Sequence, residues 1–140
     1  MKVRIKKLHS DATIPTYAKD GDAGMDLTTV SEPKITETYI EYDTGLAMEI
    51  PKGYELQIRS RSGAAIDHGL IVLNQPGTVD SDFRGSIGIV IWNITNVLVT
   101  IEAGTRIAQG VIAPVVVANF LDVAELSDTT RGSGGFGSTG

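Results

Sequence analysis

Short apolar runs, each bounded by turn-forming residues, fill most of this chain. Apolar residues recur at every second position over residues 46–50 and 86–92, which is the period of a strand with one face buried. Glycine and proline interrupt the pattern, as at Pro51-Lys52-Gly53 and Pro76-Gly77. The pattern predicts an all-β fold, a barrel or jelly roll with many tight connections. The predicted strands cover residues 3–8, 25–29, 39–42, 46–50, 54–60, 70–74, 86–93, 97–101, 106–117 and 120–126.

One segment alone favours a helix. Residues 62–67 (SGAAID) allow about two turns, and Gly69 follows as a residue that commonly ends helices. Arg61 and Ser62 stand at the start of this segment, where backbone N–H groups, a hydroxyl and a guanidinium could bind an anion together. The same residues are also compatible with an ordinary helical turn whose arginines are solvated.

The last ten residues, RGSGGFGSTG (131–140), are half glycine, so ordering their backbone has a large entropic cost. They nevertheless carry a cation, an aromatic ring and three hydroxyls, which are the groups that a phosphorylated ring compound needs in a binding site. We therefore expect a lid that becomes ordered on a ligand. The alternative is an idle, flexible terminus.

Two acids and an arginine crowd into residues 80–84 (DSDFR), between the Pro76-Gly77 turn and the next strand. An aspartate in a partly buried site can act as a general base that orients and deprotonates a water. Alternatively, Asp80 and Asp82 cap turns and pair with Arg84. The residues alone leave both interpretations open.

Another acid interrupts an apolar strand, at Asp26 between Met25 and Leu27. A carboxylate with apolar neighbours needs a partner, either a metal reached through water or an arginine from another strand. Further along, Arg106 and Gln109 are either polar partners at the edge of the core or donors to phosphate oxygens.

Composition narrows the classes of function. A chain of 140 residues with 41% hydrophobic content fits one domain. Without cysteine and with two histidines it lacks disulfides and thiolate metal sites, so oxygen ligands would hold any divalent metal. No signal peptide and no run of about 20 apolar residues is present, so we expect a soluble, cytoplasmic protein without membrane contact. The net charge of −5 argues against direct nucleic-acid binding.

Five segments together resemble the five motifs of the trimeric dUTP diphosphatases (dUTPases), in the same order and spacing. They are AGMDL (23–27), RSG (61–63), GTVDSDFRG (77–85), GTRIAQ (104–109) and RGSGGFGSTG (131–140). The resemblance implies a jelly-roll-like β-barrel of the β-clip type over residues 1–128, with one short helix. It also implies a homotrimer with shared active sites, in which the flexible tail, residues 129–140, closes the site of a neighbouring subunit.

The resemblance further implies a reaction. The first aspartate of the third motif, here Asp80, activates a water that attacks the α-phosphorus of dUTP and releases pyrophosphate and dUMP. Mg²⁺ bound to the substrate phosphates assists. Such an enzyme limits uracil in DNA and supplies dUMP for dTMP synthesis. Asp26 matches the aspartate of the first motif, for which we expect a role toward metal-bound waters or site arginines.

Residues on the nucleoside side follow from the same resemblance. Backbone groups of the third-motif hairpin recognise uracil, and the tail aromatic covers the ring. Phe83 stands where most members have tyrosine, and its ring is expected to pack under the deoxyribose and exclude a 2′-hydroxyl. The nucleoside-side residues are Asn74, Gly77, Thr78, Val79, Phe83 and Phe136. The residues expected to bind the phosphates are Arg61, Ser62, Gly63, Gln109, Arg131, Gly137, Ser138 and Thr139.

Three positions depart from the family pattern. The second motif continues with Ala64 and, where a lysine is usual nearby, has Asp67. Ser60 replaces the common proline before Arg61.

Two other functions remain as alternatives. A dCTP deaminase would share the fold but remove an exocyclic amine, and a non-catalytic β module would bind a nucleotide or a protein without turnover.

Overall fold

The computed structural model describes residues 1–95 and 97–137. Strands form nearly all of its regular structure, and one helix lies between the sixth and seventh strands. The elements in chain order are β1 (Arg4–Lys7), β2 (Met25–Thr28), β3 (Lys34–Ile35), β4 (Ile40–Asp43), β5 (Leu46–Glu49), β6 (Tyr54–Ser60), α1 (Ser62–His68), β7 (Leu70–Val72), β8 (Gly77–Val79), β9 (Gly88–Asn93) and β10 (Arg106–Pro114).

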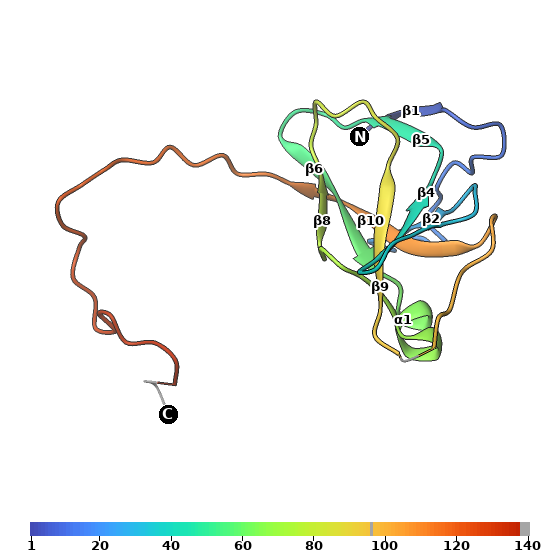
Figure 1. The fold of residues 1–140 in the computed structure, drawn as a ribbon. Coiled ribbons are helices and arrows are strands. Elements are labelled where there is room, and N and C mark those ends of the chain that lie inside the picture. Colours follow the sequence, from blue (N-terminus) through green and yellow to red (C-terminus); the bar gives the residue numbers. More distant parts are fainter. Residues whose placement is uncertain (96, 138–140) are drawn as a thin grey trace.

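Three antiparallel sheets surround one core (Figure 1). One four-stranded sheet has the order β2-β10-β6-β8, the other has the order β3-β4-β9-β7, and β1 pairs with β5 in a two-stranded sheet. Each pairing in these sheets is antiparallel. The protein is therefore all-β with one short helix in its described parts, a jelly-roll-like barrel, which confirms the fold class predicted from the sequence.

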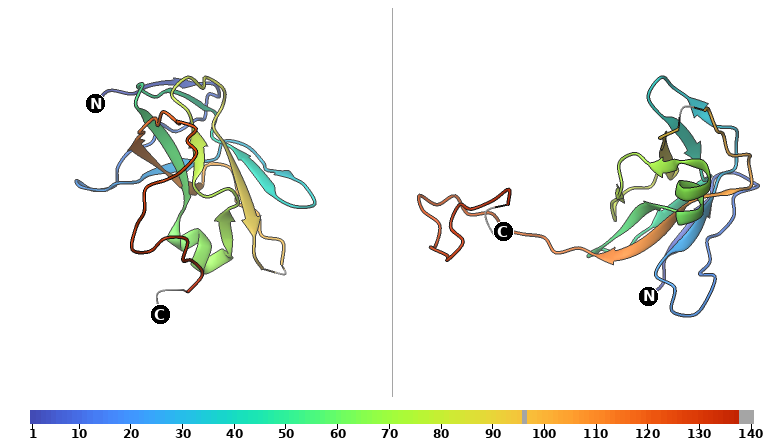
Figure 2. Two further views of the ribbon diagram at one scale, coloured as in Figure 1. Left: turned by 90° about the vertical axis from the view of Figure 1, so that its left-hand side faces the viewer. Right: turned by 90° about the horizontal axis from the view of Figure 1, so that it is seen from below.

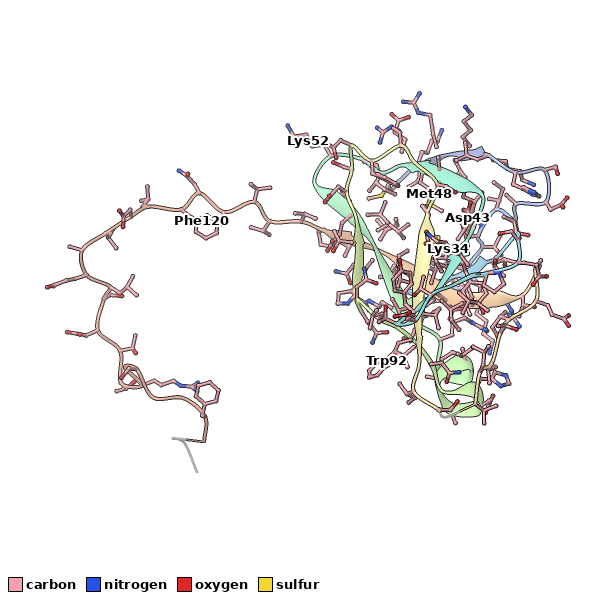
Figure 3. The ribbon with its side chains drawn as sticks, in the orientation of Figure 1. Lys34, Asp43, Met48, Lys52, Trp92 and Phe120 are labelled. Carbon is pink, nitrogen blue, oxygen red and sulfur yellow. The ribbon has the colours of Figure 1, made fainter. Side chains whose placement is uncertain are left out.

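The period-two pattern sends alternate large apolar side chains of several strands into the core. In β9, Ile89 and Ile91 are buried, whereas Trp92 is 49% exposed. In β5, Leu46 and Met48 are buried, and Glu49 lies at the surface side of the strand. Figure 3 shows Met48 within the barrel and Trp92 at its surface. Burial of these aliphatic side chains, at about 1.5–3 kcal/mol each, is the main favourable contribution to folding.

Helix α1 begins after Arg61, whose φ of −89° and ψ of 136° are extended, and ends at Gly69, whose φ of 65° is left-handed. A side chain at position 69 would also lie 2.4 Å from Cγ2 of Thr95, so both conformation and packing require glycine. The predicted helix and its glycine stop are confirmed. With seven residues α1 is too short to cross a bilayer, and no other described helix has the length and apolar character to do so.

Tyr42 is a fully buried tyrosine in the second sheet. Its phenol oxygen accepts a hydrogen bond from the Ile101 N–H at 2.8 Å. Burial raises the pKa of Tyr42 above its ordinary value, the negative charge of Glu32 adds to this rise, and the Ile101 hydrogen bond acts in the opposite direction. The neutral phenol is therefore the form that the folded state stabilises.

Replacing Tyr42 by phenylalanine leaves the Ile101 N–H without this acceptor, so we expect the free energy of unfolding to fall by about 1–2 kcal/mol. Because the pKa of Tyr42 is raised on folding, its stabilisation is complete below about pH 10 and is lost as pH rises through the folded-state pKa. Urea unfolding of both proteins at about pH 8 and about pH 10.5 measures this difference. An equally steep alkaline loss in the two proteins would contradict the assignment to Tyr42.

Two predicted strands are wrong. Residues 97–101 form no strand, because the Val97 carbonyl accepts hydrogen bonds from the side chains of Asn93 and Thr95 and closes a loop there. Residues 120–126 also form no strand: β10 ends at Pro114, and the chain then leaves the barrel without a neighbouring strand to pair with. The sequence pattern missed the short strands β3 and β8.

Beyond β10, residues 115–137 form an extended segment that projects away from the barrel (Figures 1 and 2). Its apolar side chains are open to solvent: Val116, Phe120 and Leu126 are each about nine-tenths exposed. Figure 3 shows Phe120 standing on this segment away from the barrel. A stretch this apolar is rarely left bare on a soluble protein.

Candidate functional site

A pocket of about 420 Å³ opens where α1 begins beside strands β2 and β10. It is small, polar and open on one side. Most of its lining comes from segments that the sequence singled out. The lining residues are Ala18, Asp22, Ala23, Gly24, Asp26, Arg61, Ser62, Gly63 and Gln109.

Strand register explains why these residues meet. In the first sheet, Gln109 of β10 lies opposite Asp26 of β2 on one side and opposite Arg59 of β6 on the other. Strand β6 ends at Ser60, so Arg61 and the first turn of α1 follow directly beside Gln109. Asp26 and Gln109, which are more than 80 residues apart in the chain, thus lie together at one corner of the sheet.

Asp26 is held by two arginines. Its Oδ1 lies 2.8 Å from Nε of Arg61, and its Oδ2 lies 2.9 Å from Nη1 of Arg106. Arg61 also donates through Nη1 to the Arg106 carbonyl at 3.1 Å. Of the two partners considered for Asp26, the structure contains the arginines. One carboxylate between two guanidinium groups leaves this cluster with a net positive charge, which suits an anionic ligand.

Gln109 is fixed at the same corner. Its Nε2 donates to the Ser60 carbonyl at 2.8 Å. On the other side its amide packs against Gly24, where an added Cβ would lie 2.3 Å from Oε1. Gly24 therefore allows a close approach that a side chain would block. The second Nε2 hydrogen of Gln109 can be donated to a ligand in the pocket.

The hairpin side of the candidate site is built on β8. Residues 77–79 pair with β6, Asp80 follows the strand, and the Phe83 N–H donates to the Asp80 carbonyl at 3.2 Å. The Phe83 ring covers Gly85, where an added Cβ would lie 2.6 Å from Cζ. At the base of the hairpin the Asn74 amide lies against Gly77, 3.3 Å from the Cβ position of that glycine.

A smaller pocket of about 190 Å³ lies along this hairpin. The ring of Phe83, 44% exposed, forms part of its wall. The lining residues are Thr78, Val79, Asp80, Phe83, Ser86, Ile87 and Gly88. This pocket thus brings together three of the expected nucleoside-side residues, Thr78, Val79 and Phe83, and the expected base, Asp80.

Of the two interpretations of this turn, the pairing of Asp80 and Asp82 with Arg84 is absent from the described residues. Nη1 of Arg84 donates instead to the carbonyls of Ser81 and Phe83, each at 2.8 Å, and so braces the turn. Within residues 1–95 and 97–137, Asp80 takes part in no ion pair. An exposed carboxylate without a fixed cationic partner remains free to accept a proton.

The hairpin side and the phosphate-side pocket lie at opposite ends of β6. Val79 pairs with Leu56, so Asp80 lies near the start of β6, whereas Ser62 follows its end. From Glu55 to Ser60 the strand spans roughly 16 Å at about 3.3 Å per residue. In Figure 1, the loop after β8 lies at the opposite end of β6 from α1. One chain therefore does not bring Asp80 to the pocket of Arg61, Ser62 and Gln109.

The described part of the tail, residues 129–137, contacts neither the hairpin side nor the phosphate-side pocket. Nε of Arg131 donates to the Gly134 carbonyl at 2.9 Å, a contact inside the tail itself. Phe136 is fully exposed, and Gly137 beside it has a φ of 92°. Ser138 and Thr139 lie outside the described residues. Arg131, Phe136 and Gly137 are thus presented outward from the barrel.

Comparison with known proteins identifies the family. The family model described as dUTPase matches residues 10–140. The chain belongs to the dUTPase family. A deoxyuridine 5′-triphosphate nucleotidohydrolase of Nautilia profundicola is 52% identical over 141 residues, covering 100% of this chain and 99% of the relative. One from Wolinella succinogenes is 49% identical over 143 residues, covering 100% and 95%.

Solved dUTPase structures share the fold. The dUTPase of Staphylococcus bacteriophage 80alpha with dUPNHPP superposes with a TM-score of 0.88 at 27% identity, covering 99% of this chain and 98% of that one. Family membership also confirms the resemblance drawn from the five motifs. The similarity extends over the barrel and the tail together, so the dUTPase family accounts for the whole chain.

Sequence reasoning missed two contributors to the phosphate-side corner. Gly24 belongs to the first motif, but its steric role depends on Gln109, which lies 85 positions later. Gln75 belongs to no motif, yet its Oε1 accepts the Ser60 N–H at 2.6 Å. Neither role leaves a local signal, because each depends on a tertiary contact.

Proposed function

We propose that this dUTPase-family chain hydrolyses dUTP to dUMP and pyrophosphate with Asp80 as the general base. The observation that carries the proposal is the position of Asp80: an exposed carboxylate without an ion-pair partner in the described residues, beside a pocket lined by Thr78, Val79 and Phe83. The relatives' names support the substrate, and so does the analogue bound to the related phage enzyme. In the cytoplasm this reaction would limit uracil in DNA and supply dUMP for dTMP synthesis.

The chemistry is an in-line displacement at phosphorus. Asp80 accepts a proton from a water as its oxygen forms a bond to the α-phosphorus. The bond from the α-phosphorus to its bridging oxygen breaks, and pyrophosphate leaves. Protonated Asp80 then loses its proton to solvent. The carboxylate is suited to this because the nearby Arg84 is engaged by backbone carbonyls.

Base recognition belongs to the hairpin. Backbone N–H and C=O groups of residues 77–79 can match the imide edge of uracil, which cytosine would mismatch. Asn74, lying against Gly77, assists from the hairpin base. Phe136 from a tail covers the ring, where an offset stack contributes about 0.5–1.5 kcal/mol beyond area burial.

Phe83 is expected to give discrimination against ribonucleotides. Replacing Phe83 by alanine opens space beneath the sugar, so we expect the preference for dUTP over UTP in kcat/KM to fall by roughly 10- to 100-fold. Phe83→Tyr keeps the ring and should retain the preference. Steady-state kinetics on both nucleotides measures it; similar efficiency of the unaltered enzyme on dUTP and UTP would overturn this role.

The phosphates are assigned to the charged corner. Arg61, Ser62, Gly63 and Gln109 line that pocket, and Arg131 and Gly137 of a tail would complete it, together with Ser138 and Thr139. Asp26 acts there by holding the guanidinium of Arg61 in place.

Mg²⁺ is expected to be bound by oxygens of the substrate. Residues 1–95 and 97–137 contain no group of three or more carboxylates or histidines that could hold a metal. Both oxygens of Asp26 are engaged by arginines, so this carboxylate would reach a metal only through water. When bound, Mg²⁺ neutralises part of the triphosphate charge.

A homotrimer with shared active sites would join what one chain keeps apart. Asp80 and the phosphate-side corner lie at opposite ends of β6, and residues 129–137 of the tail reach neither, so we expect a complete site to need more than one copy. The segment between β10 and the tail has exposed apolar residues, such as Val116 and Phe120. Their exposure supports burial of this segment on another copy.

The trimer is testable in solution. We expect sedimentation equilibrium to give a mass of three chains at micromolar concentration, because each site draws on different copies. A second expectation is that activity per chain falls on dilution below the range where the trimer persists. A fully active monomer would contradict the shared site.

Separate incubations with dUTP and dCTP, followed by chromatography, distinguish the candidate activities. We expect dUMP and pyrophosphate from dUTP, and neither ammonia nor product from dCTP. Ammonia from dCTP would favour the deaminase alternative. Binding of dUTP without turnover would favour a non-catalytic nucleotide-binding module.

A further inference from the structure

Ser60 is the last residue of β6, and three hydrogen bonds hold it from three sides. Its N–H donates to Oε1 of Gln75 at 2.6 Å, and its hydroxyl oxygen accepts the Val72 N–H at 2.8 Å. Its carbonyl accepts Nε2 of Gln109 at 2.8 Å. Both backbone polar groups of one residue are therefore satisfied by glutamine side chains, one from each neighbouring segment of the sheet.

Gln75 takes the place of a strand partner. The β6–β8 ladder ends with Ile58 opposite Gly77, and continuing the register by two positions brings Ser60 opposite Gln75. Pro76 carries no N–H, and the backbone turns away from β6 there. The Gln75 side chain supplies the acceptor that the ladder no longer provides. Gln75 is itself exposed, so this contact adds little apolar burial to the core.

The position of Ser60 bears directly on the phosphate-side corner. Arg61 and Ser62 follow it in the chain, and Gln109 is anchored on its carbonyl. All three line the same pocket. A shift of Ser60 would therefore move Arg61, Ser62 and the Gln109 side chain together. Small displacements of binding groups weaken affinity strongly, because their hydrogen bonds depend on distance and angle.

We propose that Gln75 is a positioning residue for the phosphate-side corner, acting through the Ser60 N–H. This inference rests on the proposed function, since it concerns how that site holds a triphosphate. The link is particular to chains with an N–H at this position. Proline, which is the common residue at position 60 in dUTPases, has no N–H and could not donate to Gln75.

Gln75→Met removes the acceptor with little change in side-chain length. We expect KM for dUTP and the inhibition constant of inorganic triphosphate to rise together, each about fivefold, with kcat changed less than twofold. Inhibition by deoxyuridine should stay the same, because pairing of residues 77–79 with β6 is intact. Gln57→Met makes the same chemical change on β6 without contacting Ser60 and serves as the control.

A double-mutant cycle tests the route of the effect. In a Ser60→Pro background the donor is absent, so Gln75→Met should cause no further change in triphosphate inhibition. In a Ser60→Ala background the N–H remains, and the full effect of Gln75→Met should persist. Additive effects in the Ser60→Pro background would overturn the proposal. So would unchanged triphosphate inhibition in Gln75→Met alone.

Two kinds of failure remain distinguishable. If the unaltered enzyme does not hydrolyse dUTP, the proposed function fails. If it does, and Gln75→Met lowers the free energy of unfolding while triphosphate inhibition stays the same, only the positioning role of Gln75 fails. Urea unfolding of each variant supplies that comparison.

Discussion

Replacing Asp80 by asparagine is expected to lower kcat for dUTP by about 10²- to 10⁴-fold, the usual contribution of a positioned general base. Asparagine keeps the shape of the side chain but cannot accept the proton of the attacking water. Binding should survive, because neither the hairpin backbone nor the phosphate-side corner changes. Single-turnover kinetics, with calorimetric binding of a non-hydrolysable dUTP analogue, measures both quantities.

Asp82→Asn is the matched control. Asp82 is an exposed carboxylate on the same turn, two residues from Asp80. We expect its replacement to leave kcat within about twofold of the unaltered enzyme, since surface substitutions away from the site have small effects. If Asp80→Asn retained full turnover, or if both variants lost activity equally, a specific role of Asp80 as the base would be refuted.

Deleting residues 131–140 is expected to give a folded trimer whose kcat/KM for dUTP is lower by roughly 10²- to 10³-fold. The deletion removes an aromatic stack of about 0.5–1.5 kcal/mol and charge-assisted hydrogen bonds of about 1.5–3 kcal/mol. The barrel should remain intact, because Phe136 is fully exposed and the Arg131 side chain donates to Gly134, a residue of the tail itself. Kinetics and sedimentation of the shortened protein provide the measurement.

Substitutions at Phe136 separate the ring from the backbone of the tail. Phe136→Ala should cause part of the activity loss that the deletion causes. Phe136→Trp should retain most of the activity because it preserves stacking. Undiminished turnover of the deletion variant would show that the tail is an idle terminus without a role in catalysis.

Local sequence predicted the elements whose cause is local. The period-two pattern around Ile89 and Ile91 predicted a strand because alternation alone decides which face is buried. Gly69 predicted a helix end because its left-handed backbone is a property of glycine. The wrong strand at 120–126 shows the limit: apolar, β-branched residues favour a strand, but a strand also needs a partner, and the chain provides none there.

Tertiary contacts explain what the sequence left open at the site. Asp26 required a partner, but only the register of β2 against β10 brings it to Arg61 and Arg106. The same holds for Gln75 and Ser60, whose contact spans the base of the hairpin. The five motifs were recognisable as a set, yet their distribution over two ends of β6 could not be deduced from their spacing.

The shared site is tested most directly by mixing two inactive variants. Asp80→Asn and the 131–140 deletion are unfolded together, refolded in equal amounts, and checked for mixed trimers by native mass spectrometry. If Asp80 and the tail of one site come from different chains, about a quarter of all sites in a random, equal mixture receive both intact groups, because each mixed trimer then has one complete site. We therefore expect dUTP turnover near a quarter of that of the unaltered enzyme. Mixed trimers without any recovered turnover would contradict a site in which Asp80 and the tail come from different copies.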